Sequence, residues 1–131
     1  MTWWQPFDPR AELIWIGASV TGPDAKPLEL LGVLDYGTPQ TIIERSIAEA
    51  IGFSEDQKIG DAVFRGVAGP PVRGYRVIAS EFKAFGRSIK DFEIICLELT
   101  EDLEVEGLIG LDFLRGLKVT TDFREGLITL E

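Results

Sequence analysis

Short runs of apolar, β-branched and aromatic residues, each closed by a cluster of turn-forming residues, extend through most of this sequence. Runs of this kind at intervals of about 8 to 12 residues are typical of strands joined by tight turns. They cover residues 13–20, 28–35, 41–45, 75–82, 88–99, 107–110, 118–123 and 127–130. We therefore predict a mostly β chain of about 8 to 11 short strands, arranged as a barrel or a sandwich.

One or two short helices are expected between these runs. Ser46 is followed three residues later by Glu49, which is the pattern of a capping box, and Gly52 is placed to end a helix of about two turns. The segment LDFLRGL, residues 111–117, predicts a second short helix that ends at Gly116.

The chain has 131 residues, which is the length of one domain, and it shows no internal repeat. Residues 1–12 are expected to form an N-terminal arm, because Pro6 and Pro9 oppose regular strand pairing there. Trp3 and Trp4 on this arm are expected to pack against their own domain or against a sister subunit. Residues 13–131 are expected to form the single domain.

Histidine is absent from the chain, and cysteine occurs once, as Cys96. The lack of histidine excludes Ser-His-Asp and Cys-His catalysis as well as metal sites built on imidazole. A single cysteine excludes an intramolecular disulfide, and we expect Cys96 to be a small buried hydrophobic residue. An enzyme with this composition therefore has to work with its 22 carboxylates.

The net charge of −9 argues against a nucleic-acid partner, because such binding depends on neutralising phosphates with Lys and Arg. No apolar stretch approaches the roughly 20 residues that a membrane-spanning helix needs. The first ten residues contain no basic segment followed by an apolar one, so no signal peptide is visible. These features predict a protein without a membrane partner, with the cytoplasm as its default location.

Asp35 is the acid whose surroundings point to chemistry. It ends the apolar run GVLD and is followed by Tyr36, Gly37 and Thr38. A carboxylate at the end of a buried strand, entering a turn that contains glycine, is held rigidly with backbone N–H groups directed at it. Taken alone, the pattern predicts only a turn, because Asp and Gly are common turn residues.

The surrounding segments change this interpretation. The run LLGVLDYGT resembles the Asp-Thr/Ser-Gly signature of the retropepsin-like aspartic proteases at all but one position, and GLIGLDFL resembles their second motif. Between the two, TIIERSIAEAIGF is similar to the strand and helix that follow the catalytic turn, and RGVAGPPVRG lies where the flap belongs. The closing segment KVTTDFREGLITL is similar to the terminal strand pair of the family. The resemblance extends over nearly the whole chain from Leu13.

The resemblance implies a closed retropepsin-like, or acid-protease, β-barrel with one or two short helices. It also implies a homodimer that cleaves a peptide or protein substrate, in which two copies of Asp35 share a proton and activate a water between them. No metal and no organic cofactor is implied. The resemblance assigns Tyr36, Gly37 and Thr38 to support of the catalytic turn. It assigns the flap to Arg65, Gly66, Val67, Ala68 and Gly69, and the structural second motif to Gly110, Leu111 and Asp112.

Tyr36 is the one departure from the signature, because the family places Thr or Ser there to hydrogen-bond across the two-fold axis. A phenol hydroxyl lies about 6.5 Å from its own Cα, so Tyr36 cannot make the same short bond. Its side chain turns aside, crosses the interface differently or separates the two halves. Thr38 matches the fourth position of the signature and is placed to hydrogen-bond Asp35.

Three functions remain open from the sequence. The first is an aspartic endopeptidase that acts as a homodimer through Asp35. The second is a catalytically silent retropepsin-like module for peptide binding or dimerisation, in which Tyr36 has removed the activity. The third is an acidic all-β interaction domain that shares only the architecture.

Overall fold

The computed structural model describes residues 2–66, 69–99 and 104–131. These residues form ten strands, two α-helices and one short 3₁₀-helix, η1. The strands are β1 (Trp3–Pro6), β2 (Trp15–Thr21), β3 (Pro27–Leu34), β4 (Ile42–Glu44), β5 (Gly60–Phe64), β6 (Val72–Ala84), β7 (Arg87–Leu97), β8 (Gly107–Ile109), β9 (Val119–Asp122) and β10 (Leu127–Leu130). The helices are α1 (Arg45–Ala50), η1 (Glu55–Gln57) and α2 (Leu111–Leu114).

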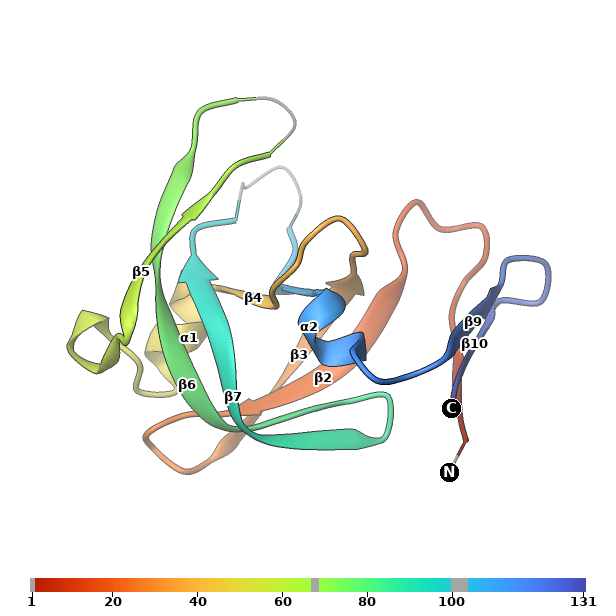
Figure 1. Cartoon of the computed structure of the whole chain (residues 1–131), viewed down its shortest axis with the longest axis horizontal. Helices are drawn as coiled ribbons and strands as arrows, with labels where there is room; N and C mark the ends of the chain where they lie inside the picture. The colour runs from red at the N-terminus through yellow and green to blue at the C-terminus, as the bar shows by residue number, and fades with distance from the viewer. Residues whose placement is uncertain (1, 67–68, 100–103) are drawn as a thin grey trace.

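Six of the strands close into a barrel in the order β2-β3-β8-β4-β7-β6, because β6 pairs back onto β2. Most neighbours are antiparallel, but β8 runs parallel to β3, and β4 runs parallel to β7. Strand β5 pairs only with β6, and the two project together from the barrel as a long hairpin (Figure 1). The predicted mostly β barrel with short helices is therefore confirmed.

Aromatic packing fills the barrel and sets the position of α2. Phe113 of α2 is fully buried, and its ring lies 5.5 Å from that of Phe82 and 5.8 Å from that of Phe92. These two rings come from β6 and β7, so α2 is packed against the interior of the barrel. Burying a phenylalanine stabilises a fold by about 1.5–3 kcal/mol, so Phe113 anchors the helix strongly.

The N-terminal segment is more regular than its prolines predict. Residues Trp3–Pro6 form β1, which pairs antiparallel with β10, and β10 pairs with β9. The expectation that Pro6 opposes regular pairing is wrong, because Pro6 is the last residue of β1, where the missing N–H does not interrupt the ladder. We call β1, β10 and β9 the terminal sheet. It brings the two ends of the chain side by side (Figure 1).

The expected capping box at Ser46 is also wrong. Helix α1 begins one residue earlier, at Arg45, and its N-cap residue, Glu44, makes no side-chain capping bond. The capping box occurs instead at η1, where Ser54 and Gln57 bond each other's backbone. Strand β4 runs directly into α1, so tertiary pairing rather than the local capping signal decides where this helix starts.

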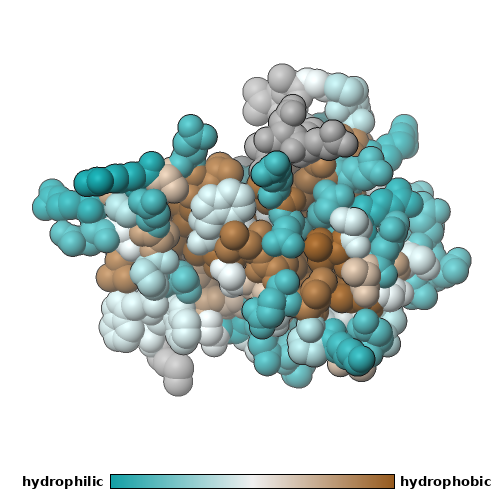
Figure 2. All heavy atoms as spheres, turned by 180° about the vertical axis from the view of Figure 1, so that it is seen from behind, coloured by the Kyte–Doolittle hydropathy of each residue, from teal (hydrophilic) through white to brown (hydrophobic). Residues whose placement is uncertain are grey.

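A second apolar cluster lies on the opposite side of the barrel strands from the main core. It contains buried side chains of β3, β4, β5, β7 and β8, and partly buried side chains pack against it: Leu13, Trp15, Phe64, Val72 and Leu99. Seen from behind, apolar side chains gather across the middle of the molecule, with hydrophilic side chains around them (Figure 2). No helix in the described ranges is long and apolar enough to cross a membrane.

Candidate active site

Asp35 lies directly after β3, where two parallel strands end together. The pairing of β3 with β8 sets Leu34 opposite Ile109. The Asp35 backbone N–H donates to the carbonyl oxygen of Ile109 at 3.0 Å, which continues the ladder by one residue. On the other side, the Leu34 N–H donates to the carbonyl oxygen of Ile14 at 3.0 Å. The backbone that carries Asp35 is therefore held from both sides.

The turn after Asp35 holds the carboxylate itself. The Gly37 N–H donates to Asp35 Oδ1 at 2.7 Å, and a Cβ added at residue 37 would lie 3.0 Å from that same oxygen. Among the described residues, Asp35 Oδ2 accepts no hydrogen bond. Asp35 is partly exposed.

Thr38 is buried, but among the described residues its hydroxyl makes no hydrogen bond to Asp35. Its hydroxyl donates to the backbone carbonyl of Gln40 at 2.8 Å. The chain bends around Pro39, and this bend brings the carbonyl oxygen of Gln40 within reach of the hydroxyl. The Thr38 hydroxyl therefore stabilises the turn by bonding the Gln40 backbone, and Gly37 donates to the Asp35 carboxylate.

The second motif braces the turn from the opposite side. The Leu111 N–H donates to the Thr38 carbonyl at 3.0 Å, and the Asp112 N–H donates to the Pro39 carbonyl at 3.1 Å. Gly110 allows this approach, because a Cβ there would lie 2.8 Å from backbone atoms of Gln40 and Thr38. The two motifs lie 75 residues apart in the sequence, and in the fold main-chain hydrogen bonds join them.

The Asp112 carboxylate is fully engaged in this brace. Its Oδ1 accepts from the Thr41 hydroxyl at 2.7 Å and from the Phe113 N–H at 2.8 Å, and its Oδ2 accepts from the Thr41 N–H at 2.9 Å. A carboxylate with three such donors is a structural group rather than a free acid. The geometry thus agrees with the structural role expected of Asp112.

Tyr36 points away from the turn, toward the terminal sheet. Its hydroxyl lies 3.3 Å from Thr121 Oγ1 on β9, and the side chain is about half exposed. Within this chain the side chain turns aside toward β9, and its position relative to a second copy stays a prediction. The space next to the Asp35 carboxylate is left open.

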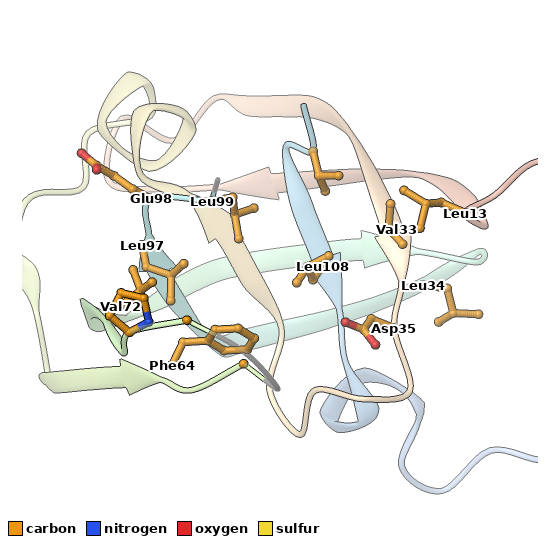
Figure 3. Close-up of a pocket in the computed structure, with 14 residues that line it drawn as sticks. Leu13, Val33, Leu34, Asp35, Phe64, Val72, Leu97, Glu98, Leu99 and Leu108 are labelled. Atoms are coloured by element: carbon orange, nitrogen blue, oxygen red, sulfur yellow. The ribbon is translucent and has the colours of Figure 1, made fainter. Parts of the chain in front are cut away.

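An apolar cavity of about 510 Å³ opens beside Asp35. Its walls carry aliphatic and aromatic side chains from strands far apart in sequence, including Val33, Leu108, Leu97 and Phe64 (Figure 3). Asp35 directs its carboxylate among these side chains, whereas Glu98 lies at the far rim (Figure 3). A cavity of this size and composition accommodates a large apolar side chain.

A second cavity, also of about 510 Å³, borders Asp35 on the side of the turn. Three polar side chains, Asp35, Gln40 and Arg65, line it with the backbone of the turn, and the apolar side chains of Val63, Phe64 and Ile95 complete it; we call it the polar cavity. Phe64 and Gly66 border both cavities, so the end of β5 separates them above Asp35. The carboxylate is thus at the junction of an apolar and a polar cavity.

The expected flap residues lie at this junction as far as the structure describes them. Arg65 and Gly66 line the polar cavity, and Gly69 lines the apolar one with a φ of +93°, which a glycine adopts without strain. Val67 and Ala68 lie outside the described residues. The described ends of the β5–β6 connection therefore border the two cavities next to Asp35.

Several lining residues were not predicted from the sequence. Phe64 and Leu97 carry no motif, and they reach the cavity only because β5, β6 and β7 are adjacent in the sheet. Gln40 directly follows the turn and could have been found by extending the motif two residues beyond Thr38. Glu93, which holds the Gln40 amide at 2.8 Å, has no sequence signal.

The other candidate nucleophile is not part of this site. Cys96 is fully buried inside the barrel, and burial raises the pKa of its thiol to about 12. In the described parts of the chain, no three His, Cys, Asp or Glu side chains converge to hold a metal ion. The chemistry available at the junction is that of a carboxylate.

A closed six-strand barrel with an aspartate after a barrel strand, braced by a Gly-containing second motif, defines the retropepsin-like fold. Comparisons with solved structures agree. A retropepsin-like aspartic protease from Rickettsia conorii superposes with a TM-score of 0.71 and 16% identity, over 99% of this chain and 89% of that one. The retroviral protease-like domain of Ddi1 from Leishmania major gives 0.59 and 15%, over 93% and 90%.

The protease of EIAV, in complex with the inhibitor HBY-793, gives a TM-score of 0.53 and 15% identity, over 81% of this chain and 88% of that one. The family model described as aspartyl protease matches residues 18–113, which include both motifs. The chain therefore belongs to the aspartyl protease family. No curated protein matches it.

Proposed function

We propose that this protein is an aspartic endopeptidase that acts as a homodimer, with Asp35 of each chain as its catalytic acid. The observation that carries the proposal is the placement of the Asp35 carboxylate. It is fixed by Gly37 and the backbone of β8, is partly exposed, and lies where two cavities meet beneath the β5–β6 hairpin. An extended peptide bound beneath this hairpin places its scissile bond at Asp35.

A second chain is required because hydrolysis of this kind uses two carboxylates. The other acid on the pair of motifs, Asp112, has both oxygens occupied by Thr41 and Phe113. The family resemblance implies that the second carboxylate is Asp35 of another copy. Tyr36 follows Asp35 directly and is about half exposed, so it leaves surface beside the acid for such a copy.

The two Asp35 carboxyl groups then hold one proton between them, because two carboxylates at short distance do not both ionise. The ionised group takes a proton from a bound water, and the resulting hydroxide attacks the peptide carbonyl carbon. The protonated group donates to the carbonyl oxygen. When the tetrahedral intermediate collapses, the C–N bond breaks and the leaving amine takes up a proton from the pair. One water is consumed, and an acid and an amine are released.

The test is an Asp35→Asn variant, compared with Asp56→Asn as a control of the same charge change on an exposed residue of η1. Cleavage of a peptide library, and its inhibition by a transition-state mimic, is expected to disappear with Asp35→Asn only. Circular dichroism checks that both variants fold. Full cleavage by a folded Asp35→Asn protein would contradict the proposal.

Mixing the chains tests the homodimer separately. If each active site needs Asp35 from two chains, an equal mixture of wild type and Asp35→Asn at full exchange leaves about a quarter of the dimers active. If each chain is active by itself, the mixture keeps about half of the activity of the same amount of wild type. Sedimentation measures the oligomeric state under the same conditions.

A catalytically silent module for peptide binding or dimerisation is the second candidate. It is favoured by the position of Tyr36, whose hydroxyl contacts Thr121 of its own chain at 3.3 Å. With its hydroxyl at Thr121, Tyr36 does not make the hydrogen bond across the two-fold axis that Thr or Ser makes in the family signature. The two candidates differ in cleavage and share peptide binding.

A further inference from the structure

The polar cavity beside Asp35 contains a side chain whose orientation is set by an ion pair. Gln40 Nε2 donates to Glu93 Oε2 at 2.8 Å, and Glu93 Oε1 lies 3.2 Å from Arg76 Nη1. Arg76 in turn donates through Nε to the carbonyl oxygen of Asp61 on β5 at 3.4 Å. The contacts cross β7, β6 and β5 and link the cavity wall to the base of the flap hairpin.

The ion pair decides which end of the Gln40 amide faces an occupant. Glu93 forms an ion pair with Arg76 and offers carboxylate oxygens as acceptors, so the amide nitrogen of Gln40 turns toward it. Gln40 lines the cavity, and so does Ile95, which shares a face of β7 with Glu93. The carbonyl oxygen, Oε1, is left for an occupant, and among the described residues it accepts no hydrogen bond.

Arg65 completes the cavity with a hydrogen-bond donor. It lines the same space near the end of β5, while Asp35 and Gln40 contribute acceptors. A neutral carboxamide matches this set, because its N–H₂ donates to Gln40 Oε1 and its carbonyl accepts from Arg65. A carboxylate of the same shape instead places an acceptor against Gln40 Oε1, near the acids Asp35 and Glu93.

We propose that Gln40, held by Glu93 and Arg76, is a specificity-determining residue that selects a substrate with Asn or Gln in the polar cavity and disfavours Asp or Glu there. The proposal rests on the proposed function for the reaction and goes beyond it in naming the side chain selected. A site that offers a fixed acceptor discriminates strongly against a group that cannot donate to it.

The experiment compares peptides that differ only by Asn, Asp, Leu or Ala at one position, scanned along both sides of the scissile bond. Wild type is expected to cleave the Asn peptide with a kcat/KM about fivefold or more above that of the Asp peptide at one position. Glu93→Gln frees the Gln40 amide to turn over and is expected to bring this ratio close to one. Gln40→Leu is expected to shift the preference to Leu.

Glu29→Gln, on the exposed far end of β3, is the matched control and is expected to keep the wild-type ratio. Thermal unfolding establishes that each variant is folded. The proposal is overturned if wild type cleaves the peptides without an Asn preference, or if folded Glu93→Gln and Gln40→Leu both keep that preference.

Calorimetric binding of the same peptides to the Asp35→Asn protein separates this proposal from the proposed function. If wild type cleaves nothing but Asp35→Asn binds the Asn peptide more tightly than the Asp peptide, the specificity stands and the endopeptidase proposal fails. Equal binding of the two peptides, or no binding of either, overturns the specificity.

Discussion

The hydroxyl of Tyr36 lies 3.3 Å from the hydroxyl of Thr121, so the residue after the candidate catalytic acid contacts the terminal sheet of its own chain. Thr121 is opposite Ile128, which is buried, and this pairing directs both side chains toward the barrel rather than away from it. The phenol therefore bridges the turn that follows β3 of the larger sheet and β9 of the terminal sheet.

Substitution of Tyr36 tests what this contact contributes. An exposed neutral hydrogen bond contributes about 0.5–1.5 kcal/mol to stability, so Tyr36→Phe is expected to lower the free energy of unfolding by no more than that and to leave cleavage within a few fold. Urea unfolding and peptide cleavage measure the two effects. Tyr36→Thr restores the small hydroxyl. If that variant cleaves peptides and wild type does not, the silent module is the correct function.

Gly110→Ala is expected to destabilise the protein by about 1–3 kcal/mol and to reduce cleavage, because the new methyl group meets backbone atoms that cannot move independently. Its Cβ would lie 2.8 Å from carbonyl atoms of Thr38 and Gln40. Gly17→Ala is the matched control, because a Cβ there has no heavy atom within 4 Å. Urea denaturation should separate the two variants clearly. Equal stabilities would show that the backbone of the turn moves aside for a methyl group at residue 110.

Asp112→Asn is expected to cost about 1–3 kcal/mol of stability, because an amide N–H₂ then faces a donor from Thr41 or from the helix backbone. The carboxylate now accepts three hydrogen bonds at 2.7–2.9 Å. We expect cleavage to fall in proportion to the folded fraction, measured at increasing urea. A folded, fully stable Asp112→Asn protein without cleavage would instead make Asp112 a chemical participant.

Acid stability depends in part on Glu81. Hydrogen bonds from Lys90 and Ser88, with Lys83 nearby, lower the pKa of its carboxyl from 4.5 to about 2. A pKa lower in the folded than in the unfolded chain stabilises the fold above pH 4.5, and this contribution is lost as the pH falls toward 2. Glu81→Gln is therefore expected to flatten the fall in stability over this range. Unfolding curves for the two proteins that keep a constant separation from pH 5 to pH 2 would contradict the assignment.

Cys96 is expected to resist thiol reagents until the barrel opens. Burial raises the pKa of its thiol to about 12, so almost no thiolate is present near pH 8, and the side chain has no exposed surface. Labelling with a chromogenic disulfide should therefore follow the unfolding rate and accelerate in urea. Rapid labelling of the folded protein would place Cys96 at the surface.

The barrel and its short helices could be predicted from the sequence, because strand alternation and turn residues act locally. Individual boundaries could not. Ser46 and Glu49 form a good local capping signal, yet α1 begins at Arg45 because β4 is held between β7 and β8 and leads straight into the helix. Pro6 suggests an irregular arm, yet it ends a strand that β10 holds in place.

The sequence by itself determined which groups can act as acid and base: in a chain without histidine these are carboxylates. It also showed that Asp35 ends an apolar run and enters a turn that contains glycine. Only the tertiary structure decided the surroundings of that acid. Closure of the barrel brings Phe64, Leu97 and Leu108 around one cavity and Gln40 against Glu93 in the other. These contacts join residues tens of positions apart, so no local pattern records them, and the side chain of Tyr36 could settle against Thr121 only once β9 was in place.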